Sequence, residues 1–203
     1  MSFIMLSFLI SQDIALLNYL RSFIDPNSAL QVKIIHIGSD IEVALVMLVL
    51  IGLWLYGVYK KNNQFKIDAL MMLYSIGLAF LIYIILNLGL PLRPRPETVS
   101  SIRPLVDHLP DNSFPSGHGI FAGASIFAAF LYTRRCIAGI LLISGIFMLL
   151  SRILAGIHYP GDIFIGSIIG AIGAYIIYIL RNKKFMTEYL LVYPVKIAKF
   201  FKL

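Results

Sequence analysis

Five long apolar segments dominate the sequence, and they restrict the chain to a membrane fold. A helix needs roughly 20 apolar residues to cross a hydrocarbon core of about 30 Å, and each segment approaches that length once its flanks are included. The composition agrees, since 59% of the 203 residues are hydrophobic and only 13% are charged, unlike a typical soluble domain. We therefore predict an all-α integral membrane bundle with five transmembrane helices at residues 43–59, 69–92, 114–132, 136–150 and 163–180.

The first 24 residues are also apolar, but polar residues interrupt them. We predict an N-terminal amphipathic helix that lies in the membrane interface, with a sixth span as the alternative. A cleavable signal peptide is not expected, because no positive region precedes the apolar run and no small-residue cleavage site follows it. The interrupting residues are Ser11, Gln12, Asp13 and Arg21, and the apolar residues at helical spacing are Leu16, Leu17, Leu20 and Phe23.

The positive charges lie in alternate loops, which predicts the orientation of the bundle. The formal net charge is +7, and by the positive-inside rule the basic loops share the cytoplasmic side. The loops at 91–113 and 151–162 then share the periplasmic or exterior face of the cytoplasmic membrane. This distribution argues for membrane topology and against a nucleic-acid partner, and no obligate protein partner is evident. The basic residues are Lys60, Lys61, Lys66, Arg134, Arg135, Arg181, Lys183, Lys184, Lys196, Lys199 and Lys202.

No internal repeat, low-complexity tract or polar linker divides the sequence, so we predict one domain over residues 1–203. Its membrane core comprises residues 40–181, between an N-terminal interfacial segment at 1–38 and a cytoplasmic basic amphipathic tail at 185–203. Cys136 is the only cysteine, which excludes an internal disulfide and a cysteine-based metal site. Glycines at helical spacing predict close helix packing: Gly119, Gly123, Gly166, Gly170 and Gly173.

Both non-cytoplasmic loops concentrate ionisable residues that burial in a membrane would otherwise exclude. Such residues are costly at membrane depth, so a set on one face is a functional-site hypothesis. Arginines offer forked cationic donors that suit phosphate oxygens. A hydroxyl and a glycine amide at a helix start add donors where the helix dipole favours an anion. The sequence therefore predicts a phosphate-binding site formed by Arg93, Arg95, Ser116, Gly117 and Arg152.

Two histidines and an aspartate add the groups that phosphate chemistry requires. Asp162 follows His158 by four residues, a spacing at which a carboxylate can fix the imidazole tautomer and leave the other nitrogen as a nucleophile. His118, on another helix, could protonate the departing oxygen and then activate water. We expect neither a metal nor a cofactor, because the cluster lacks a carboxylate-rich set and its three arginines would repel a cation.

The order and spacing of these residues resemble the type 2 phosphatidic acid phosphatase superfamily of integral membrane lipid phosphatases. The signature of that superfamily has three parts, Lys-x6-Arg-Pro, Pro-Ser-Gly-His and Ser-Arg-x5-His-x3-Asp. The second part is complete at residues 115–118 and the third at residues 151–162. The similarity extends over residues 40–180, and the two complete motifs fall on the same predicted membrane face.

The first part of the signature departs from the pattern. Arg93 and Arg95 are each followed by proline, but Leu86 and Leu88 stand seven residues upstream, where the lysine belongs. The doubled arginine could compensate for the missing ammonium group. Either arginine could then be the motif residue.

The resemblance implies a role for each matching residue. His158 would be the nucleophile, Asp162 its orienting partner and His118 the general acid. The residues implied to bind phosphate are Ser116, Gly117, Arg152 and either Arg93 or Arg95.

These observations favour a metal-independent membrane lipid phosphatase that acts through a phosphohistidine. The resemblance is compatible with undecaprenyl diphosphate, lipid A phosphate and phosphatidylglycerophosphate as substrates, each presented from the lipid bilayer. Two alternatives stay open: a phosphotransferase that passes the phosphate to another lipid, and a non-catalytic lipid transporter or scramblase. The second needs only headgroup binding, which would not require a nucleophile and an acid.

Other polar residues are expected to have structural roles. His36 and His108 stand apart from both motifs, and we interpret them as ordinary structural histidines. Asp111 and Ser113 lie just before the helix that begins near residue 114, and we expect them to cap it.

Overall fold

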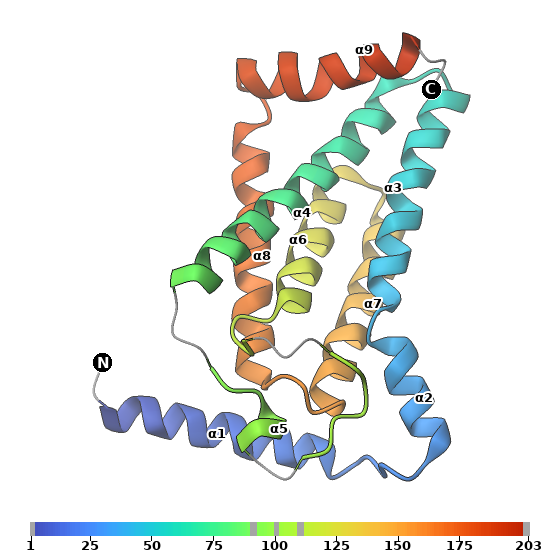
Figure 1. Cartoon of the computed structure of the whole chain (residues 1–203). Helices are drawn as coiled ribbons and strands as arrows, with labels where there is room; N and C mark the ends of the chain where they lie inside the picture. The colour runs from blue at the N-terminus through green and yellow to red at the C-terminus, as the bar shows by residue number, and fades with distance from the viewer. Residues whose placement is uncertain (1–2, 90–92, 100–101, 109–111, 201–203) are drawn as a thin grey trace.

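The computed structural model describes residues 3–89, 93–99, 102–108 and 112–200. Every regular element in these ranges is helical, so the all-α prediction is confirmed. The elements, labelled in Figure 1 where there is room, are α1 (Phe3–Arg21), α2 (Ala29–Gly38), α3 (Ile41–Tyr59), α4 (Asn63–Gly89), α5 (Pro96–Val99), α6 (Gly117–Tyr132), α7 (Arg135–Leu154), α8 (Pro160–Leu180), the π-helical segment η1 (Met186–Val192) and α9 (Tyr193–Phe200).

Helices α3, α4, α6, α7 and α8 form the bundle (Figure 1), and each contains most of one predicted apolar segment. The α2–α3 segment, α4, α7 and α8 are long and apolar enough to cross a membrane, and α6 is a shorter apolar helix. The fold is thus an integral membrane helical bundle. Helix α4 begins at Asn63, six residues before the predicted segment 69–92, whose residues 90–92 lie outside the described ranges.

Helix α6 packs against α8 more extensively than any other pair of described helices, and glycines let the two backbones meet. A Cβ atom on Gly166 would lie 2.7 Å from the Ser116 carbonyl oxygen, and one on Gly170 would collide with the Ile120 carbonyl oxygen. The predicted close packing through small residues is therefore confirmed. Since this contact includes Ser116, it holds the beginning of α6 against α8.

Replacing Gly170 with alanine should destabilise the bundle, because the added methyl group meets a helix backbone that cannot move aside locally. We expect a loss of about 1–3 kcal/mol, measured as a lower melting temperature of the detergent-solubilised protein. Gly139→Ala is the matched control, because nothing lies within 4 Å of a Cβ atom there and alanine favours a helix over glycine. Equal melting temperatures for the two variants would contradict this account.

A helix lies across each end of the bundle (Figure 1). Helix α1 crosses the end where α6 and α8 begin, and α9 crosses the opposite end. The inner face of α1 buries Leu17 against Ile153 and Ile163. Leu16 on α1 and Phe23, two residues after its end, are exposed. Because α1 does not run alongside the bundle helices, its placement favours the predicted interfacial helix over a sixth span.

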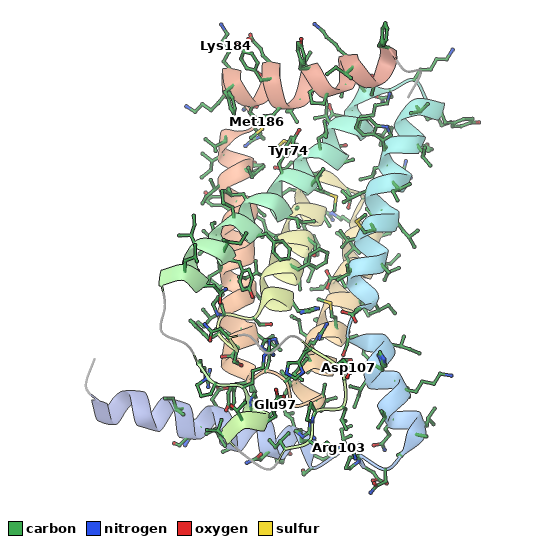
Figure 2. The ribbon with its side chains drawn as sticks, in the orientation of Figure 1. Tyr74, Glu97, Arg103, Asp107, Lys184 and Met186 are labelled. Carbon is green, nitrogen blue, oxygen red and sulfur yellow. The ribbon has the colours of Figure 1, made fainter. Side chains whose placement is uncertain are left out.

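The connections between bundle helices alternate between the two ends, as predicted. Figure 2 shows Glu97, Arg103 and Asp107 at the α1 end and Lys184 at the α9 end. The C-terminal tail is amphipathic, since Leu191 is buried against α4 and Lys196 is exposed. Lys202 lies outside the described residues, and which side of the membrane each end faces stays a prediction.

Candidate active site

A cavity of about 540 Å³ lies at the α1 end of the bundle, between α3, α4, α6 and the α7–α8 connection. Its size falls within the roughly 300–1,000 Å³ that is typical of small-ligand sites. Part of the wall is apolar, with Val43, Phe80 and Phe121 from three different helices. The structure brings five predicted site residues together in the polar part of the wall: Arg95, Gly117, His118, Arg152 and His158.

His158 occupies the short connection between α7 and α8 and is 3% exposed. Its Nδ1 lies 3.0 Å from the Ser113 carbonyl oxygen, and its Nε2 lies 3.4 Å from Nη1 of Arg95. A carbonyl oxygen only accepts hydrogen bonds, so the proton of the neutral ring is on Nδ1. The lone pair is then on Nε2, in the wall of the cavity.

The surroundings of His158 also favour its neutral form. Burial is the main cause that lowers the pKa of His158 below its ordinary value of 6.5, because desolvation disfavours the charged ring. The Asp162 carboxylate opposes this shift, and the Arg95 guanidinium adds to it. The nitrogen facing Arg95 is therefore unprotonated at neutral pH.

Asp162 lies beside His158 but beyond hydrogen-bond distance of its ring, and its predicted orienting role stays a prediction. Its Oδ2 lies 3.9 Å from Nδ1 of His158, which is too long for a hydrogen bond. The same Oδ2 accepts from the Ser113 hydroxyl at 2.5 Å and from the Tyr159 amide at 3.1 Å. Asp162 is thus connected to His158 through Ser113, whose carbonyl oxygen contacts the imidazole. The i,i+4 spacing brought the two side chains close, but the ring turns toward the backbone of another loop.

His118, in the first turn of α6, belongs to a network with Arg152 and Asp40. Nη2 of Arg152 donates to Oδ1 of Asp40 at 2.6 Å and contacts Nε2 of His118, while its Nε donates to the Ser39 carbonyl oxygen at 3.1 Å. Nε2 of His118 also lies 3.2 Å from Oδ1 of Asp40. Nε2 of His118 therefore faces both a donor, the Arg152 guanidinium, and an acceptor, the Asp40 carboxylate.

Ser116 and Gly117 form the start of α6, as the sequence predicted. Ser116 is the N-cap residue, is fully buried, and accepts from the Gly119 amide at 3.3 Å. Gly117 is the first helical residue and lines the cavity, where an amide has no intrahelical partner. The prediction that Ser113 caps this helix is wrong, because its hydroxyl is bound to Asp162. Asp111 lies outside the described residues.

The two arginines of the Arg-Pro doublet point in different directions. Arg95 lines the cavity and donates from Nη1 to the Ile157 carbonyl oxygen at 2.7 Å. Arg93 is not among the residues that line the cavity; it pairs with Asp162, and its guanidinium lies 4.0 Å from the centre of the Tyr159 ring. Arg95 therefore fits the motif position. Leu88, seven residues upstream, is 84% exposed.

Three acidic residues and one histidine in or beside the cavity were not given a site role from the sequence. Asp40, just before α3, holds Arg152. His108 lines the cavity and contacts Glu97, with 2.5 Å between Nε2 and Oε1, and Asp107 lines it too. The one sequence feature that pointed to these residues was their position at the predicted non-cytoplasmic face of the bundle. Among the described residues, no three His, Cys, Asp or Glu side chains group as metal ligands would, and metal independence stays a prediction.

A sequence profile described as the PAP2 superfamily matches residues 68–186. That range is more than half of the chain and includes both complete motifs. The chain belongs to the PAP2 superfamily. It is 30% identical over 146 residues to a protein of Bacillus subtilis strain 168 named undecaprenyl-diphosphatase BcrC, and the alignment covers 72% of each chain.

Two further comparisons extend this result. The chain is 32% identical over 71 residues to a Bacteroides thetaiotaomicron protein named lipid A 4'-phosphatase. That alignment covers 34% of this chain and 32% of the Bacteroides protein. The crystal structure of Aquifex aeolicus LpxE shares the fold with a TM-score of 0.53 and 23% identity, over 76% of this chain and 98% of that one. Helices α1, α2 and α3 precede the range that the PAP2 profile matches.

The protonation of His158 can be checked directly by nitrogen NMR of the protein labelled at histidine. We expect the Nδ1-protonated neutral tautomer, and we expect it to persist at pH 6.5, because the lowered pKa keeps most rings neutral there. His158→Gln identifies the resonance. A ring protonated on Nε2, or a doubly protonated ring at pH 6.5, would contradict the described geometry.

Proposed function

We propose that this protein is a metal-independent membrane lipid phosphatase that works through a phosphohistidine intermediate on His158. The observation that carries the proposal is the buried, neutral His158, whose Nε2 lies 3.4 Å from an arginine that lines the cavity. A neutral imidazole nitrogen is a nucleophile. Mere headgroup binding would not require that tautomer to be fixed.

In the first step, Nε2 of His158 attacks phosphorus, and the bond between phosphorus and the lipid oxygen breaks. His118, in the imidazolium form that a bound phosphate dianion favours, faces Asp40 with its Nε2 and gives the departing oxygen its Nδ1 proton. Arg95 and Arg152 stabilise the negative charge of the phosphoryl oxygens, and the Gly117 amide at the start of α6 adds a donor. No atom is oxidised or reduced, and the phosphoryl group is now bonded to Nε2.

In the second step, water attacks the phosphorus of the phosphohistidine, and the bond from phosphorus to Nε2 breaks. His118, which lost its proton in the first step, takes one from the water. Inorganic phosphate leaves, and both histidines return to their starting forms. The contact of Arg152 with His118 and Asp40 places the acid beside the phosphate-binding arginine.

The substrate we propose is a phosphorylated lipid. Val43, Phe80 and Phe121 give the cavity an apolar side that suits a hydrocarbon chain, while the arginines and histidines suit its phosphate. We place undecaprenyl diphosphate first, because the relative named for that activity aligns over 72% of this chain, against 34% for the one named for lipid A. Phosphatidylglycerophosphate completes the set of candidates.

We place the active site on the periplasmic or exterior face of the cytoplasmic membrane. The support is the distribution of charge, since the basic connections and the basic tail gather at the α9 end, opposite the cavity. Positively charged loops favour the cytoplasmic side.

The proposal is tested by phosphate release from the three candidate lipids in the presence of EDTA. We expect release by the wild type and a loss of several orders of magnitude in His158→Ala, because the nucleophile is removed. His36→Ala is the matched control, because His36 lies on α2 and does not line the cavity. Activity that survives in His158→Ala, or that EDTA abolishes, would contradict the mechanism. Transfer of labelled phosphate to a second lipid would instead indicate a phosphotransferase.

A further inference from the structure

Helix α1 lies outside the range that the PAP2 profile matches, yet it contacts both ends of the connection that carries His158. At one end, Arg21 donates to the Leu154 carbonyl oxygen at 2.8 Å. At the other, Oδ1 of Asp13 accepts from the Gly161 amide at 2.8 Å. Residues 155–159 therefore lie between two contacts made by a single helix.

Asp13 makes a second contact, and that contact leads to the catalytic group. Its Oδ2 lies 2.6 Å from Nη2 of Arg93, and Nη1 of the same guanidinium binds Oδ1 of Asp162. Arg93 thus bridges two carboxylates, which its planar fork allows and a lysine ammonium would not match. Asp162 binds the Ser113 hydroxyl, and the Ser113 carbonyl oxygen contacts His158.

These contacts are shielded from water, so they are stronger than ordinary surface ion pairs. The side chains of Arg93, Asp13 and Asp162 are 23%, 13% and 0% exposed. The approach of Asp13 also depends on Gly161, because a Cβ atom there would lie 2.9 Å from Oδ2 of Asp13. The beginning of α8 is therefore shaped to receive this carboxylate, and the helix dipole favours it there.

The other contact of α1 shows the same close approach. Gly156 has a φ of 79°, a conformation that glycine adopts readily, and a Cβ atom there would collide with Nη1 of Arg21. Between the two polar contacts, Leu17 is buried with Ile153 and Ile163. Apolar packing and hydrogen bonding thus hold α1 against α7, α8 and the connection between them.

We infer that α1 clamps the α7–α8 connection, and that Asp13 is a positioning residue for His158, acting through Arg93 and Asp162. Arg93 then serves this clamp and not phosphate binding, which is left to Arg95 and Arg152. The inference rests on the proposed function, because it assigns α1 to the same reaction. It explains why the chain has two Arg-Pro pairs, since each arginine has a separate task.

The kinetic test uses Asp13→Asn and Arg93→Gln, alone and combined, with Asp25→Asn as the matched control on the same N-terminal segment. Asp25 is exposed and contacts a local turn. We expect each single variant to lower kcat about 10- to 100-fold, the effect of a catalytic group displaced by about 1 Å. KM should stay within about threefold, because substrate contacts are intact.

The double variant decides whether the two residues act together. Since both act through Asp162, we expect Asp13→Asn combined with Arg93→Gln to lose about as much kcat as either change alone. Arg95→Gln should differ by raising KM, because Arg95 lines the cavity. The clamp would be overturned if Arg93→Gln raised KM as Arg95→Gln does, if Asp13→Asn left kcat unchanged, or if the two losses multiplied.

A second readout does not depend on activity. In Asp13→Asn, the nitrogen NMR signals of His158 should shift or broaden, whereas Asp25→Asn should leave them unchanged. Unaltered His158 signals would overturn the clamp even if the proposed phosphatase reaction is established. Altered signals in a protein that releases no phosphate would support the clamp and reject the proposed function, so the two failures are distinguishable.

Discussion

The candidate site depends on the carboxylate of Asp162, which is fully buried. A buried carboxylate is costly unless it is surrounded by donors, and here the donors are Arg93, the Ser113 hydroxyl and the Tyr159 amide. The first two belong to the α4–α6 connection and the third precedes α8. Satisfying one charge therefore holds the two connections together, and the Ser113 carbonyl group is placed against His158 as a consequence.

His158 and His118, two of the histidines that line the cavity, have different polar partners. Nδ1 of His158 faces a carbonyl oxygen that only accepts, whereas Nε2 of His118 faces the Arg152 guanidinium, a donor, and the Asp40 carboxylate, an acceptor. His158 is thereby left with a lone pair on Nε2, whereas the Asp40 carboxylate stabilises a protonated His118. Environments that separate two like groups in this way assign the nucleophile and the acid. The tight packing of α6 on α8 fixes the start of α6, which carries His118, by holding Ser116 against Gly166.

Much of the fold could be predicted from the sequence, because length and hydropathy alone identify a helix that crosses a bilayer. The spaced motifs likewise identified Gly117, His118, Arg152 and His158, which the structure brings to one cavity. Partners from distant segments could not be predicted: Asp13 meets Gly161 across 148 residues, and Arg152 meets Asp40 across 112. No local period or spacing encodes such contacts. The choice between Arg93 and Arg95 stayed open for the same reason, since only tertiary structure directs each guanidinium.

The most direct test of the central claim is to trap the intermediate. The wild-type protein is mixed with lipid substrate labelled at the transferred phosphate, quenched within one turnover in alkali, and digested for mass spectrometry. The account predicts phosphate on the peptide that contains His158, stable to alkali, lost in acid and absent from His158→Gln. Rapid phosphate release with no labelled protein at any quench time, or label on a residue other than His158, would contradict it.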